Sequence, residues 1–154
     1  MDKKFNGGGE MSVWTHVIGG IRLDSFSFRP FENKLKKIFI ESTFHNWNEK
    51  CNMPCGSEGS IRYKIIRNED ESCLNVCQIA FWGDLRDYDS QCVKKEFKSW
   101  LESVKKKLKR ANFLIRQINL SVECEDGLVA LYGIDEYDGK IVEKIIKEAD
   151  NVAP

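Results

Sequence analysis

An alternating segment followed by a turn signal constrains the fold of this chain most strongly. In residues 113–124, FLIRQINLSVEC, the apolar side carries Leu114, Ile118, Leu120 and Val122, and the polar side carries Gln117, Asn119, Ser121 and Glu123. A period of two is typical of a half-buried β-strand. Asp126-Gly127 follows, a dipeptide that favours tight hairpin turns, and residues 128–134, LVALYGI, are again apolar. The sequence therefore predicts an antiparallel hairpin here.

Residues 93–108 have a helical period instead. Apolar side chains recur there at three- and four-residue spacing: Val93, Phe97, Trp100, Leu101, Val104 and Leu108. The opposite face carries seven lysines: Lys94, Lys95, Lys98, Lys105, Lys106, Lys107 and Lys109. Glu96 and Glu102 interrupt them, and the chain balances 24 Lys+Arg against 24 Asp+Glu. We therefore expect a solvated helix face rather than a nucleic-acid site.

The remaining segments complete an α+β pattern. We predict a strand over 12–24 with a bulge, bend or turn at Gly19-Gly20, a helix over 31–41, and a hairpin formed by 61–68 and 73–83. A polar loop is expected over 84–90, and a short amphipathic helix in the C-terminal tail.

This order, β-α-β-β-α-β with an extra C-terminal strand and a short helix, predicts a ferredoxin-like split βαβ fold. Helices would cover one face of its sheet. The other face would be partly polar and would carry Arg62, Lys64, Gln117 and Asn119.

Length and composition favour one domain over residues 11–150. The chain has 154 residues, of which 42% are hydrophobic, enough for one core. Gly7-Gly8-Gly9-Glu10 before Met11 matches a translated ribosome-binding site, so we interpret residues 1–10 as a disordered, non-native leader. No apolar segment approaches the roughly 20 residues that span a bilayer, and the N-terminus lacks a secretory signal. We expect a cytoplasmic protein without membrane contact, whose six cysteines are mostly free thiols.

The loop Gly56-Ser57-Glu58-Gly59-Ser60 is the first candidate binding element. Glycines let backbone approach a ligand closely, and successive N–H groups with serine hydroxyls bind anions. The loop lacks the spacing and the Lys-Ser/Thr ending of a P-loop. The alternative is a loop that needs glycine only for its backbone conformation.

The segment from Trp82 to Asp89, WGDLRDYD, is the second candidate. Asp84, Arg86, Asp87 and Tyr88 offer hydrogen-bonding groups of both signs before a helix, where binding residues often gather. The structural alternative is that Asp89 or Ser90 caps the helix while Asp84 or Asp87 pairs with Arg86.

Three further groups are weaker candidates. His16 lies within a predicted strand, where a satisfied structural histidine is the commoner outcome. His45, Cys51 and Cys55 have a spacing that fits zinc sites poorly, so we expect no metal site and no cofactor. No nucleophile elbow or duplicated His-x-Thr signature is present, so the sequence predicts no catalytic residue.

Three segments together resemble a family of small bacteriophage and prophage accessory proteins. They are Val13-Trp14-Thr15-His16-Val17 with Ile21-Arg22 and Asp24, the GSEGS loop, and WGDLRDYD, and the resemblance spans roughly residues 11–124. It implies a phage protein in the host cytoplasm that counters host defence by binding. It carries over no catalytic residues.

Three functions remain open. The first is sequestration of a small anionic ligand such as a signalling nucleotide. GSEGS, Arg86 and Arg22 would hold the ligand, Tyr88 or Trp82 would stack on it, and His16 would lie nearby. The site would be shared between the chains of a homodimer or higher oligomer. The second is an anti-CRISPR-like inhibitor of a host defence nuclease, which predicts an exposed apolar or charged patch. The third is a metal-dependent phosphodiesterase or hydrolase using Asp84, Asp87 or Asp89.

Overall fold

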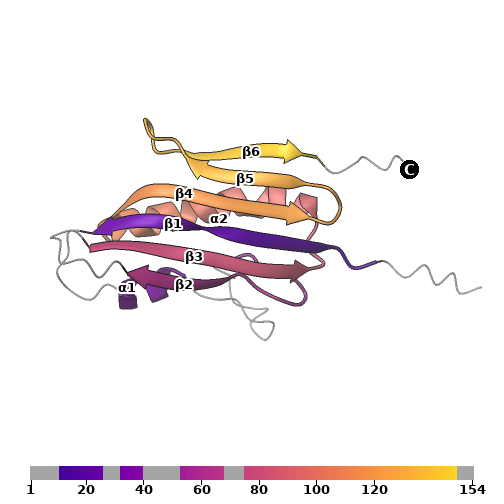
Figure 1. The fold of residues 1–154 in the computed structure, drawn as a ribbon, viewed down its shortest axis with the longest axis horizontal. Coiled ribbons are helices and arrows are strands. Elements are labelled where there is room, and N and C mark those ends of the chain that lie inside the picture. Colours follow the sequence, from indigo (N-terminus) through magenta and orange to yellow (C-terminus); the bar gives the residue numbers. More distant parts are fainter. Residues whose placement is uncertain (1–10, 26–31, 40–52, 68–74, 149–154) are drawn as a thin grey trace, which may run out of the picture.

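A computed structural model describes residues 11–25, 32–39, 53–67 and 75–148. One antiparallel sheet of six strands dominates it (Figure 1), and the strands are β1 (Trp14–Ser25), β2 (Arg62–Arg67), β3 (Asn75–Arg86), β4 (Phe113–Cys124), β5 (Val129–Ile134) and β6 (Ile141–Lys147). Their order across the sheet is β2-β3-β1-β4-β5-β6. The three longest strands, β1, β3 and β4, therefore lie side by side in its middle.

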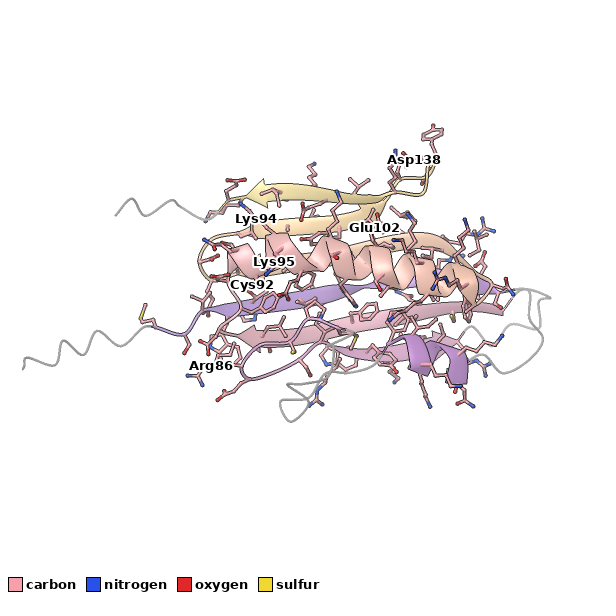
Figure 2. All side chains as sticks on the ribbon, turned by 180° about the vertical axis from the view of Figure 1, so that it is seen from behind. Arg86, Cys92, Lys94, Lys95, Glu102 and Asp138 are labelled. Carbon is pink, nitrogen blue, oxygen red and sulfur yellow. The ribbon has the colours of Figure 1, made fainter. Side chains whose placement is uncertain are left out.

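Both helices lie on the same side of the sheet, and Figure 2 shows that side. The long helix α2 (Ser90–Arg110) buries the apolar stripe predicted from its spacing, including Phe97 and Leu108. The short helix α1 (Glu32–Ile38) contributes Leu35, and Phe39 beyond its end packs on Phe81 of β3. The core therefore fills the space between the helices and one face of the sheet.

The structure corrects the expected ferredoxin-like fold. The described chain is a β-rich protein in which six antiparallel strands form one sheet and only two helices are present. Part of the tail expected to be a short amphipathic helix is strand β6, which pairs with β5 from Ile134↔Ile141 to Val129↔Lys147. Its β-branched residues suit a strand, and the free edge of β5 supplies the backbone partners.

Two local expectations are also corrected. Strand β1 passes through Gly19-Gly20 without a turn or a register shift, and its register against β4 shifts instead between Arg22 and Leu23. Opposite that shift β4 has one extra residue, Arg116, which has no register partner on β1. The extra residue reverses which side chains face the core at the start of β4. For this reason Leu114 is exposed although Ile118 and Leu120 are buried.

Among the described residues no helix covers the second face of the sheet, which we call the open face. Figure 1 looks onto it. The predicted polar residues do lie on it or along it: Arg62, Lys64, Gln117 and Asn119 are all exposed. The predicted leader, residues 1–10, and the end of the predicted domain, 149–150, lie outside the described residues.

Candidate functional site

The GSEGS loop and the end of β3 lie against each other. The Ser57 N–H donates to the carbonyl oxygen of Arg86 at 2.9 Å, and the Arg86 N–H donates to the carbonyl of Glu58 at 2.9 Å. The Gly56 N–H donates within the loop, to the carbonyl of Gly59 at 3.2 Å. Two segments selected separately from the sequence therefore form one corner of the molecule, and two of the loop amides expected to cradle an anion bond to backbone carbonyls.

Close backbone contact explains the two glycines of this loop. A Cβ atom at Gly59, where φ is 78°, would lie 1.9 Å from the carbonyl oxygen of Asp84. A Cβ atom at Gly56 would lie 2.3 Å from the carbonyl oxygen of Arg86. Neither position has room for any side chain, so the structural reading of these glycines has a direct physical basis.

Arg86 is surrounded by acceptors on its own chain. Its Nη1 lies 2.8 Å from the carboxylate of Glu58, and its Nε donates to Ser12 Oγ at 3.0 Å. Asp87 Oδ2 lies 4.0 Å from the same Nε and also accepts a hydrogen bond from Ser57 Oγ. An anion at this corner would have to compete with two carboxylates for one guanidinium.

Asp84 pairs with His16 rather than with Arg86. The Nδ1 of His16 and a carboxylate oxygen of Asp84 are 2.6 Å apart across the β1–β3 ladder, on the open face. Glu123 of β4 is the register partner of His16 on its other side. This histidine therefore lies in a row between two acidic residues.

Tyr88 and Asp89 have structural roles. Tyr88 is only 3% exposed, and its hydroxyl donates to Glu96 at 2.6 Å, so its ring is not available to stack on a ligand. Burial and the bond to Glu96 raise the pKa of this hydroxyl. Asp89 caps α2 by accepting from the Cys92 N–H at 2.9 Å, which confirms the capping expectation.

Arg22 lies on the open face far from the corner. Its register partner on β3 is Gln78. Arg22 is six residues from His16 along β1, a distance of about 20 Å in a strand. The structure therefore brings GSEGS, Arg86 and Asp87 together and His16 and Asp84 together, but it separates Arg22 from both groups.

The open face has an apolar centre that the sequence analysis did not identify. One row of register partners crosses all six strands: Arg62, Trp82, Ile18, Ser121, Leu131 and Lys144. Within it Ile18 is 67% exposed, Trp82 45% and Leu131 40%. Trp82 is one of the two aromatic residues that we expected to stack on an anionic ligand. Its neighbour Phe81 takes the core position, and adjacent residues of a strand point to opposite faces.

Metal and thiol chemistry find little support in the described ranges. No group of three or more His, Cys, Asp or Glu side chains there could hold a metal ion. Asp84, Asp87 and Asp89 each bond to a different partner. Cys77, Cys92 and Cys124 are free thiols, and burial raises the pKa of Cys77 and of Cys124 to about 11. Cys51, Cys73 and His45 lie outside the described residues.

A scan of protein-family models, a search of curated proteins and a search of solved structures each return no match to this chain. None of the helices in the described part is long and apolar enough to cross a membrane. The site itself must therefore carry the argument about function.

Proposed function

We propose that this chain acts by binding another protein chain through the open face of its sheet. The supporting observation is the row of exposed apolar side chains at the centre of that face, Ile18, Trp82 and Leu131. Large apolar residues exposed together are typical of protein interfaces, where tryptophan is often a major contributor to affinity.

The surroundings of this row also suit a protein interface. Charged residues border much of it: Arg62 and Lys144 at its ends, and Asp84, Glu123 and Arg22 further along the strands. Two more apolar side chains are exposed on the outer strands, Ile66 on β2 and Val142 on β6. An apolar centre inside a polar rim is the usual arrangement of such surfaces. The alternative, an anionic ligand at GSEGS and Arg86, is less well supported because Glu58 and Asp87 already surround that guanidinium.

The biological setting that we propose follows the resemblance to phage accessory proteins. The chain would work in the host cytoplasm and counter a defence protein such as a nuclease. We expect it to restore plaque formation on bacteria that carry the relevant defence system. Ile18→Asp should abolish this protection, because it places a charge at the apolar centre, whereas Tyr137→Asp should not. Tyr137 is 100% exposed in the β5–β6 turn and serves as the matched control.

Contact at the open face can be measured directly. A photo-crosslinking amino acid at position 131, incorporated in infected cells, should give covalent adducts with a protein identified by mass spectrometry. The same amino acid at position 137 should give far fewer. Equal adduct yields at the two positions would contradict the proposal.

A further inference from the structure

The open face carries two parallel rows of opposite character. The large row contains Trp82, Ile18 and Leu131 on β3, β1 and β5. A second row, which we call the small row, lies two residues further along the same three strands. It contains Ala80, Gly20 and Gly133. On these three strands a protruding apolar side chain therefore adjoins a position with a methyl group or no side chain, which makes a ridge beside a hollow. On β4, between β1 and β5, the two rows carry Ser121 and the exposed Asn119 instead.

The rows beyond these two differ in charge. Next to the large row lie Asp84 and Glu123, on either side of His16. Next to the small row lies Arg22, between Gln78 and Gln117. The open face is thus acidic beyond its ridge and carries a cation beyond its hollow.

Two-fold symmetry makes such a face complementary to itself. An axis that lies between two facing sheets and crosses the strands places each strand over its own copy with reversed direction. If the axis passes between the two rows, each large row lies over the small row of the second copy. Asp84 and Glu123 then lie on either side of the partner's Arg22.

We infer that the protein bound to the open face is a second copy of this chain, an inference that rests on the proposed function. The two copies pack face to face, so that Trp82 and Ile18 lie over the partner's Ala80 and the partner's Gly20. Aligned sheets pack about 10 Å apart and about 30° from parallel. The rows match best on β1 and β3 in the middle of the sheet and diverge toward its edges. Arg62 and Lys64 on β2 lie at the rim, where long side chains extend into solvent.

The size of the face fits a stable dimer. Six strands at the usual spacing are about 24 Å wide. The three strands of 12 residues are about 40 Å long, and the other three, of 6 or 7 residues, are about 20 Å long. A sheet face of that size is on the order of the 800 Å² that each partner buries in a standard protein interface.

The first test is sedimentation velocity of the full chain over a range of concentrations. The wild-type protein is expected to be a dimer. Ile18→Asp and Trp82→Ala should each raise its dissociation constant about thirtyfold or more, with unchanged circular dichroism, because both residues are central. Tyr137→Asp should have no effect. A monomeric wild type would overturn the inference. A dimer that neither variant weakens would also overturn it, because a dimer formed by pairing of sheet edges would behave in that way.

A charge exchange tests the alignment. Arg22→Glu and Glu123→Arg should each weaken the dimer about fivefold, and the double variant should restore it. Within one chain these residues are about 20 Å apart along the strands, so restoration can only come from contact between copies. Weakening without restoration would overturn the proposed axis.

The crosslinking result separates this inference from the proposed function. Self-adducts at position 131 support both. Adducts with a host protein only, together with a monomeric purified chain, would overturn the inference and leave the proposed function standing. Equal adduct yields at positions 131 and 137 would contradict both.

Discussion

The imidazole Nδ1 of His16 lies 2.6 Å from a carboxylate oxygen of Asp84, and both side chains remain about half or more exposed, at 49% and 66%. A second close pair has a different environment. Arg116 Nε donates to Asp24, whose side chain is only 7% exposed and whose other carboxylate oxygen has no partner among the described residues. Exposed ion pairs contribute little to stability, whereas a buried charge that loses its partner is costly.

The two pairs should therefore respond differently to substitution. His16→Ala is expected to change the free energy of unfolding by less than about 1 kcal/mol. Arg116→Met should cost about 3 kcal/mol, because it leaves a buried carboxylate without its cation. Adding Asp24→Asn to Arg116→Met should recover part of that loss. Urea unfolding of the four proteins measures these changes, and a larger effect at His16 than at Arg116 would contradict the prediction.

Gly59→Ala should separate the GSEGS loop from β3. Its Cβ atom would collide with the Asp84 carbonyl, and φ is 78°, so we expect a loss of about 3 kcal/mol or more. Gly139→Ala is the matched control. Gly139 also has positive φ, 66°, but nothing lies within 4 Å of its Cβ position, so strain alone should cost about 1 kcal/mol. Equal losses in thermal or urea unfolding would argue against the close contact.

The buried thiols should react slowly with iodoacetamide. A pKa raised from 9.0 to about 11 lowers the thiolate fraction of Cys77 and Cys124 at pH 8 about a hundredfold, since only the thiolate reacts. Mass spectrometry of the native protein after timed alkylation should show these two sites modified last. The same sites should react rapidly after denaturation, which serves as the control.

Stability should fall at alkaline pH. Burial, together with hydrogen bonds to Glu96 and Glu143, raises the pKa of Tyr88 and Tyr132 above the ordinary value of 10.0. The unfolded chain loses these protons near pH 10 while the folded chain keeps them. The stabilisation is therefore complete below pH 10 and is lost above it, by about 1.4 kcal/mol per pH unit for each tyrosine.

Unfolding midpoints measured from pH 8 to 11 test this prediction. Tyr132→Phe should be less stable at pH 8, because it lacks the hydroxyl bonded to Glu143 at 2.7 Å, but its stability should fall less steeply above pH 10. The same slope in wild type and variant would contradict the assignment.

The sequence predicted those features that depend on local periodicity. The helical spacing of Val93, Phe97 and Leu108 identified the buried face of α2, and the alternation of 117–122 identified the two faces of β4. Asp89 as a cap and Asp126-Gly127 as a turn were also predicted, because caps and turns involve residues close in the chain. The prediction that Leu114 lies on the buried side of β4 was wrong, because a register shift against β1 decides its orientation.

Long-range packing decided the rest. Residues 141–147 have apolar spacings that suit either a helix or a strand, and the free edge of β5 selected the strand. The contact of GSEGS with β3 depends on residues about 28 apart in the chain, as the Glu58–Arg86 pair shows. Sequence alone determined which side chains share a face of α2 and of the regular part of β4, since that period is set by backbone geometry. Only the tertiary structure decided which face of the sheet the helices cover, and therefore that Ile18, Trp82 and Leu131 lie exposed together.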